Sequence, residues 1–195
     1  MGTTSNMAIP YPESSDYVAD GATAMENIAT QVDDKSGLIF VKSQAVGSSV
    51  SSVTVTDAFS ATFKNYKVIY SGFTMTAFTG LLFSMGSGIN GSQWFGVTTG
   101  RSYILGVTNT NVSNGGAIAI ATGSGVVNRV GTEIFLTRPY VSGRTGMSAI
   151  STGERGHFTT AMHDGNNSYT DFTLSTASGT ITGGTIRVYG YNDGA

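Results

Sequence analysis

The chain has 195 residues, of which 11% are charged, and its formal net charge of −2 argues against a general affinity for nucleic acid or acidic membranes. Glycine is abundant at 27 residues and proline is scarce at 3, while aromatic residues reach 10%, so the composition excludes a disordered chain and favours short strands joined by turns. Cysteine is absent, which excludes disulfides, thiolate metal ligands and a cysteine nucleophile.

Residues 1–17 are predicted to form an extended arm, because Pro10 and Pro12 push the residues before them toward extended conformations. No basic segment followed by an apolar run opens the sequence, and no stretch is apolar and long enough to span a bilayer, so we expect neither a secretory signal nor membrane insertion. The large side chains of the arm have no local partner, so we expect the arm to anchor the chain on another protein. The predicted anchor residues are Ile9, Pro10, Tyr11, Pro12 and Tyr17.

A helix is predicted over residues 18–33, with Asp16 as its cap. Its apolar residues recur at spacings of four, three, four and three, which is the a and d pattern of about two heptads. A helix of this length is marginal in isolation, so it either lies on its own domain or packs against copies of itself as a three-fold collar. For the collar, the predicted trimer contacts are Val18, Ala22, Met25, Ala29 and Val32, which together form the helix seam.

From Gly37 onward the hydrophobic period changes to two, which predicts strands separated by turns rich in Gly, Asn and Ser. Many short strands of this kind are typical of a β-sandwich or jelly roll. We therefore predict an all-β fold, with an arm and helix at 1–36 and an antiparallel, jelly-roll-like β-sandwich at 37–195 whose last strand lies inside a sheet. The predicted strands are residues 38–44, 50–59, 66–73, 77–85, 93–99, 102–108, 116–122, 127–137, 157–163, 169–175 and 185–191.

Motifs for catalysis are missing from the sequence. It contains neither a GxSxG nucleophile turn nor a GxxxxGK[ST] phosphate loop. Glu133 and Glu154 are the only glutamates of the predicted β-domain, so a carboxylate pair for glycoside cleavage lacks support. We expect no enzyme, no catalytic residue and no cofactor.

Two histidines, His157 and His163, stand near Glu154 and Asp164 and raise the question of a metal site. On a straight strand their spacing corresponds to about 20 Å, so a shared ion would need a bend or a second subunit. We expect solvated histidines in a loop or strand and no metal site, with metal binding as the alternative.

Trp94 is the single tryptophan and follows the loop-like segment GINGSQ. An exposed aromatic ring can stack on a sugar, so Trp94 is a candidate contact for a host-surface glycan. The alternative is that Trp94 fills the core, as large aromatic side chains on strands usually do.

Three segments of the sequence carry a family resemblance. IPYPESSDYVADGATAMENIATQVD is similar to a leader in which a proline-rich arm precedes a short helix, and LIFVKSQAVGSSVSSVTVTDAFSATFKNYKVIYSG is similar to a strand–strand opening. NNSYTDFTLSTASGTITGGTIRVYGY resembles a closing segment that ends in GTIRVYGY. All three resemble parts of virion appendage proteins of tailed bacteriophages, the minor tail, fibre and head-fibre-like proteins. The middle of the chain, about residues 75–155, carries no such resemblance.

The resemblance implies a location on the virion surface after synthesis in the host cytoplasm, and it implies a homotrimer. It also implies contacts with other virion proteins, such as tail, connector or major capsid protein, and a role of the β-domain in host adsorption. The alternative is a capsid decoration protein that cements the head without binding a receptor. The two alternatives differ in the protein that the arm contacts.

Overall fold

The computed structural model describes residues 2–3, 10–11, 13, 21–35, 37–77, 79–86, 93–102, 106–123, 130–152 and 155–192. The chain divides into two compact units, which we name the N-terminal unit (residues 1–39 with 192–195) and the β unit (residues 40–191). No helix among the described residues has the length and apolar character needed to cross a bilayer.

The N-terminal unit contains one helix, α1 (Gly21–Lys35), and a short antiparallel pair made of β1 (Gly2–Thr3) and β2 (Pro10–Tyr11). The helix contacts β2, and its Ala24 is buried with 2% exposure. A helix is thus found where the heptad spacing predicts one. The predicted cap, Asp16, lies outside the described residues.

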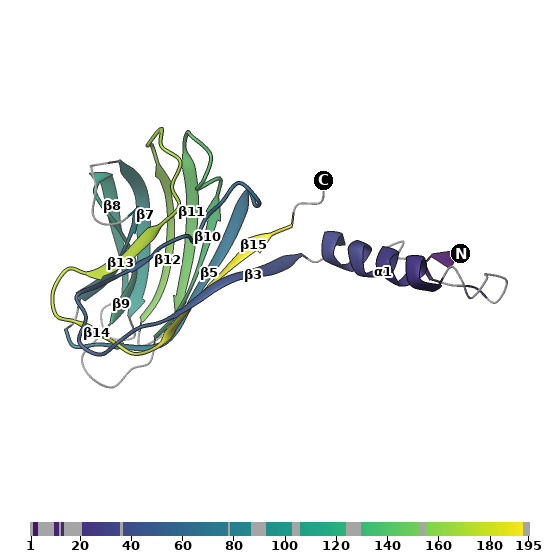
Figure 1. The fold of residues 1–195 in the computed structure, drawn as a ribbon. Coiled ribbons are helices and arrows are strands. Elements are labelled where there is room, and N and C mark those ends of the chain that lie inside the picture. Colours follow the sequence, from purple (N-terminus) through teal and green to yellow (C-terminus); the bar gives the residue numbers. More distant parts are fainter. Residues whose placement is uncertain are drawn as a thin grey trace. The chain divides into compact units, whose positions relative to one another are not determined.

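The β unit is an antiparallel β-sandwich, so the predicted fold class is confirmed (Figure 1). The large sheet has the order β3-β15-β5-β10-β11-β12-β7-β8, with β14 beside β5, and the small sheet has the order β4-β13-β6-β9. The strands of the large sheet are β3 (Leu38–Ala45), β15 (Thr185–Tyr191), β5 (Asn65–Met75), β10 (Val130–Thr137), β11 (Thr145–Thr152), β12 (Arg155–His163), β7 (Trp94–Ser102), β8 (Gly106–Gly115) and β14 (Ile181–Thr182). Those of the small sheet are β4 (Ser52–Val55), β13 (Phe172–Thr176), β6 (Thr79–Met85) and β9 (Ile118–Gly123).

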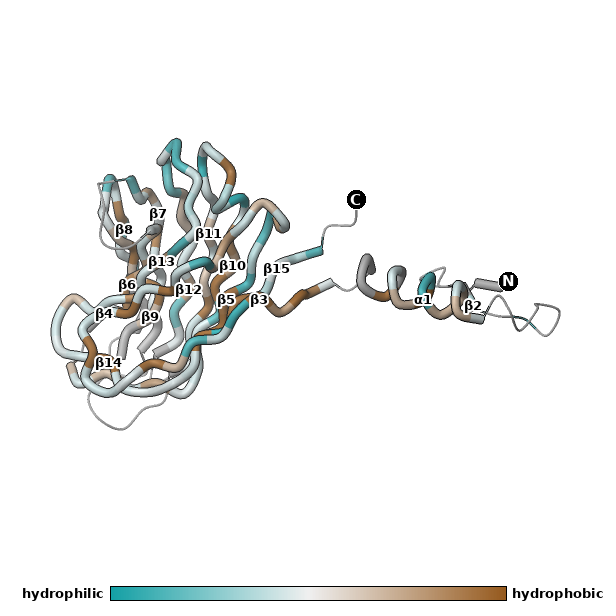
Figure 2. The backbone as a smooth tube through the Cα atoms, in the orientation of Figure 1, coloured by the Kyte–Doolittle hydropathy of each residue, from teal (hydrophilic) through white to brown (hydrophobic). Residues whose placement is uncertain are grey.

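The core lies between the two sheets. It is formed by residues at alternate positions of the strands, whose side chains point inward. In β5, Tyr66, Val68 and Tyr70 are fully buried, while the residues between them are half-buried. Figure 2 shows hydrophobic residues recurring at intervals along the strands of the β unit. In β15, Ile186 and Val188 are fully buried, and the strand lies between β3 and β5. The prediction that the last strand lies inside a sheet is therefore confirmed.

Strand β9 is the edge of the small sheet, and hydroxyl groups of the large sheet bind its carbonyl groups. Thr98 Oγ1 and Thr159 Oγ1 donate to the carbonyl oxygen of Ala119 at 3.0 and 2.9 Å, and Ser151 Oγ donates to the carbonyl oxygen of Ile120. The three hydroxyl-bearing residues are buried. Because an unpaired buried carbonyl is costly, these bonds explain why Thr and Ser occupy core-facing positions of β7, β11 and β12.

Two parts of the strand prediction are wrong. The sequence does not predict β11, because its Gly, Ser and Thr residues have the composition of a turn. In the structure this segment is a strand, in which Met147 and Ala149 face the core and Ser151 donates a hydrogen bond to β9. The predicted strand 102–108 is not one strand, because Ser102 ends β7, Gly106 begins β8 and the two strands pair antiparallel. Residues 103–105 between them lie outside the described part of the chain.

Candidate functional site

The helix seam is exposed. Met25 is 73% exposed and Val32 is 44% exposed. Ala24 is buried and Ile28, one turn later, is half-buried, so the helix packs within its own unit through a different set of positions. Val18 lies outside the described residues. The described seam residues are Ala22, Met25, Ala29 and Val32, all of them exposed. Their contact with other copies of the chain stays a prediction.

The predicted anchor falls largely outside the described residues. Pro10 and Tyr11 form β2, where Tyr11 lies opposite Gly2 and is 44% exposed. The structure describes neither Ile9 nor the other two predicted anchor residues, Pro12 and Tyr17. The anchoring role of the arm stays a prediction.

Trp94 is buried, with 1% exposure, so the predicted glycan contact is wrong. The residue begins β7 and points into the core, where its ring packs edge-on against Phe83 and His163 at centroid distances of 5.9 and 5.0 Å. A sugar cannot reach an indole in this position. The alternative, that Trp94 fills the core and removes a large apolar surface from water, is correct.

The prediction of solvated histidines is also wrong, because both histidines lie on the core-facing side of β12. His157 is 9% exposed and His163 is 2% exposed. The two residues are an even number of positions apart, so they share one face of the strand, and that face is buried. Among the described residues, no group of three or more His, Asp or Glu side chains could hold a metal ion.

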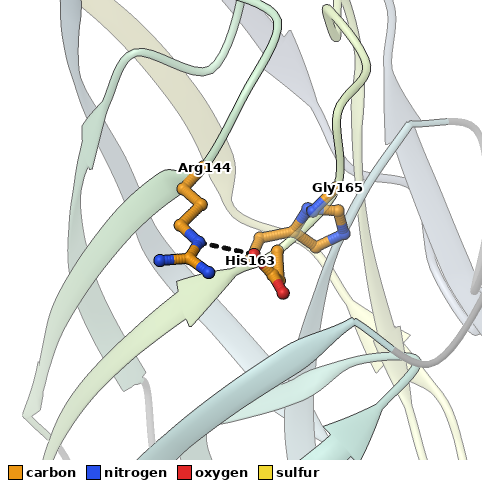
Figure 3. A network of polar contacts seen from close by, with 4 residues as sticks. Arg144, His163 and Gly165 are labelled. Carbon is orange, nitrogen blue, oxygen red and sulfur yellow. Dashed lines mark hydrogen bonds and ion pairs between the residues drawn. The ribbon is translucent and has the colours of Figure 1, made fainter.

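His163 is held in its neutral form. The backbone N–H of Gly165 donates to His163 Nδ1 at 3.2 Å, so Nδ1 carries no proton. Burial lowers the pKa of His163, and the nearby negative charge of Asp164 opposes this shift. The Asp164 carboxylate in turn pairs with Arg144 at 2.6 Å (Figure 3). These bonds connect the end of β12 to the loop after it and to Arg144.

The large sheet has a second apolar surface, its outer face, which points away from the small sheet. Ile150 on β11 is 56% exposed and Phe158 on β12 is 50% exposed, and the two are direct cross-strand partners. Phe95 on β7 and Phe40 on β3 are 37% and 57% exposed. Side chains of this size would normally be covered, so the outer face is the candidate interaction surface of the β unit.

A hollow of about 190 Å³ opens on the outer face beside Ile150. An ion pair crosses it, with Lys67 Nζ 2.8 Å from Glu133 Oε2. The Tyr191 ring packs edge-on against Phe135 at a centroid distance of 5.4 Å and forms part of the rim. The hollow is lined by Lys67, Glu133, Ile134, Phe135, Ser148, Ile150 and Tyr191.

None of the predictions from the sequence includes the outer face, although the sequence contains a signal for it. The segment EIFLT has three apolar residues in succession, so Phe135 must lie on the face opposite Ile134 and Leu136. Likewise, Phe158 stands next to His157, which faces the core. Strands with apolar residues at successive positions are apolar on both faces.

The chain is therefore an antiparallel β-sandwich protein with a helical N-terminal unit, an exposed helix seam and an apolar outer sheet face. No protein-family model matches the chain, and neither does any curated protein. Among solved structures, it is similar to the carbohydrate-binding module CBM66 from Bacillus subtilis, with 14% sequence identity over 80% of this chain and 93% of that chain and a TM-score of 0.23. A likeness at this TM-score carries no argument about what the chain binds.

Proposed function

We propose that this chain is a structural protein of a tailed bacteriophage virion, a homotrimeric surface appendage of the tail-fibre or head-fibre type that takes part in host adsorption. The phage assignment rests on the three sequence segments described above. The structural observation that supports the trimer is the exposed helix seam, with Met25 at 73% and Val32 at 44% exposure.

The seam supports self-association for a physical reason. Fully burying a Met or Val side chain stabilises a protein by about 1.5–3 kcal/mol relative to leaving it in water. Ala22 and Ala29 alternate with the larger seam residues and allow the helices to approach closely. A helix of 15 residues is marginal alone, so association through the seam would also stabilise the helix itself.

In the proposed particle, residues 1–17 bind another virion protein and the β unit is displayed. Pro10 and Pro12 stiffen the arm, which lowers the entropy lost when it becomes ordered on a partner. The acidic side chains of Glu13, Asp16 and Asp20 favour a basic groove on that partner.

The proposal is tested on purified particles of the phage that encodes the chain. We expect mass spectrometry to detect the protein in the particle and cryo-electron microscopy to show three copies at each attachment point. A chain deleted for residues 1–17 should remain a folded trimer but should be absent from particles. Absence of the full-length protein from intact particles would refute the proposal. Density distributed over the capsid lattice, together with normal adsorption of particles that lack the protein, would instead identify a decoration protein.

A further inference from the structure

We propose that the outer face of the large sheet is buried against a second copy of this chain. The proposal extends the oligomer from the helix seam to the β unit, and it rests on the self-association that the proposed function includes. It assigns Ile150, Phe158, Phe95 and Phe40 to an interface between copies.

The exposed side chains of the outer face supply part of the apolar surface that such a contact needs. The four exposed side chains are 56%, 50%, 37% and 57% exposed. With about 200 Å² for a side chain of this size, they leave roughly 400 Å² of side-chain surface in water, which is about half of what one partner contributes to a standard interface. Half-buried neighbours on the same face add to this area. They include Ile69, Val97, Phe135, Met162 and Tyr189.

The exposed side chains lie in small clusters on neighbouring strands. Ile150 pairs with Phe158, and Phe95 pairs with Met162. At the sheet edge, the Phe40 ring packs edge-on against Tyr189 at a centroid distance of 5.8 Å. Glu133 lies between Ile150 and Ile69, so a charged side chain separates part of the apolar surface.

Charge favours another copy over a charged partner. Among the described side chains of the outer face, the charged ones are Lys67, Glu133 and Arg187. Lys67 and Glu133 neutralise each other at 2.8 Å, which leaves Arg187 as a single positive charge, too little to select a strongly acidic partner. Two copies of a face with so little net charge repel each other only weakly, and most oligomers of soluble proteins are made of identical chains.

The exposed seam gives a second reason to choose a copy of the same chain. If helices associate through the seam, the β units attached to them are held together at an effective concentration on the order of millimolar. At this concentration a modest apolar face is sufficient for contact, even where isolated β units would bind weakly. If no copy of the chain covered the outer face, the apolar side chains of Phe158 and Ile150 would remain exposed to water in every molecule.

The first experiment introduces charge into the outer face of the full-length chain. We expect Phe158→Lys combined with Ile150→Lys to weaken self-association at least tenfold in sedimentation equilibrium, with an unchanged far-UV circular dichroism spectrum, because each copy then carries added positive charge on the outer face. Ser178→Lys is the matched control, because Ser178 lies in the exposed turn after β13. We expect it to leave self-association unchanged.

A second experiment reports on the face without disturbing it. The natural chain has no cysteine, so a single introduced thiol is the only site for a maleimide. Thr160 on the outer face and Ser178 in the turn are both exposed in the chain. We expect the thiol of Thr160→Cys to react at least tenfold more slowly than that of Ser178→Cys in the oligomer, and at a similar rate after dilution to monomer.

Equal reaction rates of the two thiols in the oligomer would overturn the proposal, whatever the charge variants do. A chain that stays monomeric at all concentrations would overturn it as well. So would a Thr160→Cys thiol that becomes protected only when host-surface polysaccharide is added, because that result assigns the face to a glycan. The proposed function is tested separately by the presence of the protein in particles, so a virion protein whose outer face reacts freely would refute this inference alone.

Discussion

The two threonines that share the carbonyl of Ala119 allow a quantitative test of how the sandwich is held together. Thr98 Oγ1 and Thr159 Oγ1 donate to this carbonyl at 3.0 and 2.9 Å, and Thr159 is fully buried. Thr→Val at either position removes one hydroxyl and nearly preserves the shape of the side chain. The two hydroxyl groups also contact each other, with Thr159 Oγ1 donating to Thr98 Oγ1 at 3.2 Å. Each single variant removes this contact and leaves the carbonyl with the other threonine as its donor, so each should lower the free energy of unfolding by about 1 kcal/mol.

The double variant should cost more than the sum of the single variants. It leaves the Ala119 carbonyl oxygen without either threonine donor, which adds about 1–3 kcal/mol. The contact between the two hydroxyl groups is lost in both single variants but only once in the double variant, which offsets about 1 kcal/mol of this cost. We therefore expect a net positive coupling energy of about 1 kcal/mol between Thr98 and Thr159. In thermal unfolding, each 1 kcal/mol corresponds to a decrease of about 2–4 °C in Tm for a chain of this size.

The assay is urea denaturation of the four proteins at one protein concentration, because association changes apparent stability. Thr110→Val is the matched control, since Thr110 is exposed on β8, and it should change stability by less than about 0.5 kcal/mol. A double variant whose loss equals the sum of the two single losses would show that the shared carbonyl does not couple the sheets.

Three further predictions concern the helix seam, the last strand and His163. Met25→Glu with Val32→Glu should convert the trimer to monomers in sedimentation experiments while the β unit keeps its far-UV spectrum; trimers that persist would refute the collar. A Cβ atom added at Gly190 would overlap the Phe63 ring, so Gly190→Ala should destabilise the chain by about 1–3 kcal/mol in urea, and an unchanged midpoint would contradict this packing. Burial lowers the pKa of His163, so the unfolded chain binds a proton at this residue more readily than the folded chain does. The contribution of the neutral His163 to the free energy of unfolding is therefore complete above about pH 6.5 and is lost as the pH falls below this value. His163→Gln should remove this part of the pH dependence of unfolding between about pH 7 and pH 5, and identical slopes for the two proteins would argue against it.

The sequence alone determined features that depend on local periodicity. The alternation in YKVIYSGF predicts β5, and TIRVYGY predicts β15, in which Ile186 and Val188 are buried in the structure. The helix is predicted by apolar residues spaced three and four positions apart, a spacing that places them on one face of a helix but not on one face of a strand. These predictions succeed because the period of two or 3.6 is set by backbone geometry within a few residues.

The tertiary structure decided what the local pattern leaves open. β11 is rich in Gly, Ser and Thr residues that resemble a turn, and it is a strand because Met147 and Ala149 face the core and Ser151 Oγ donates to a carbonyl of β9. Trp94 follows a loop-like segment, yet it is buried because β7 places it against Phe83 and His163. Likewise, β15 lies between β3 and β5, which are distant from it along the chain. Strand pairing and the choice of the buried face depend on contacts between distant residues, and no local period contains that information.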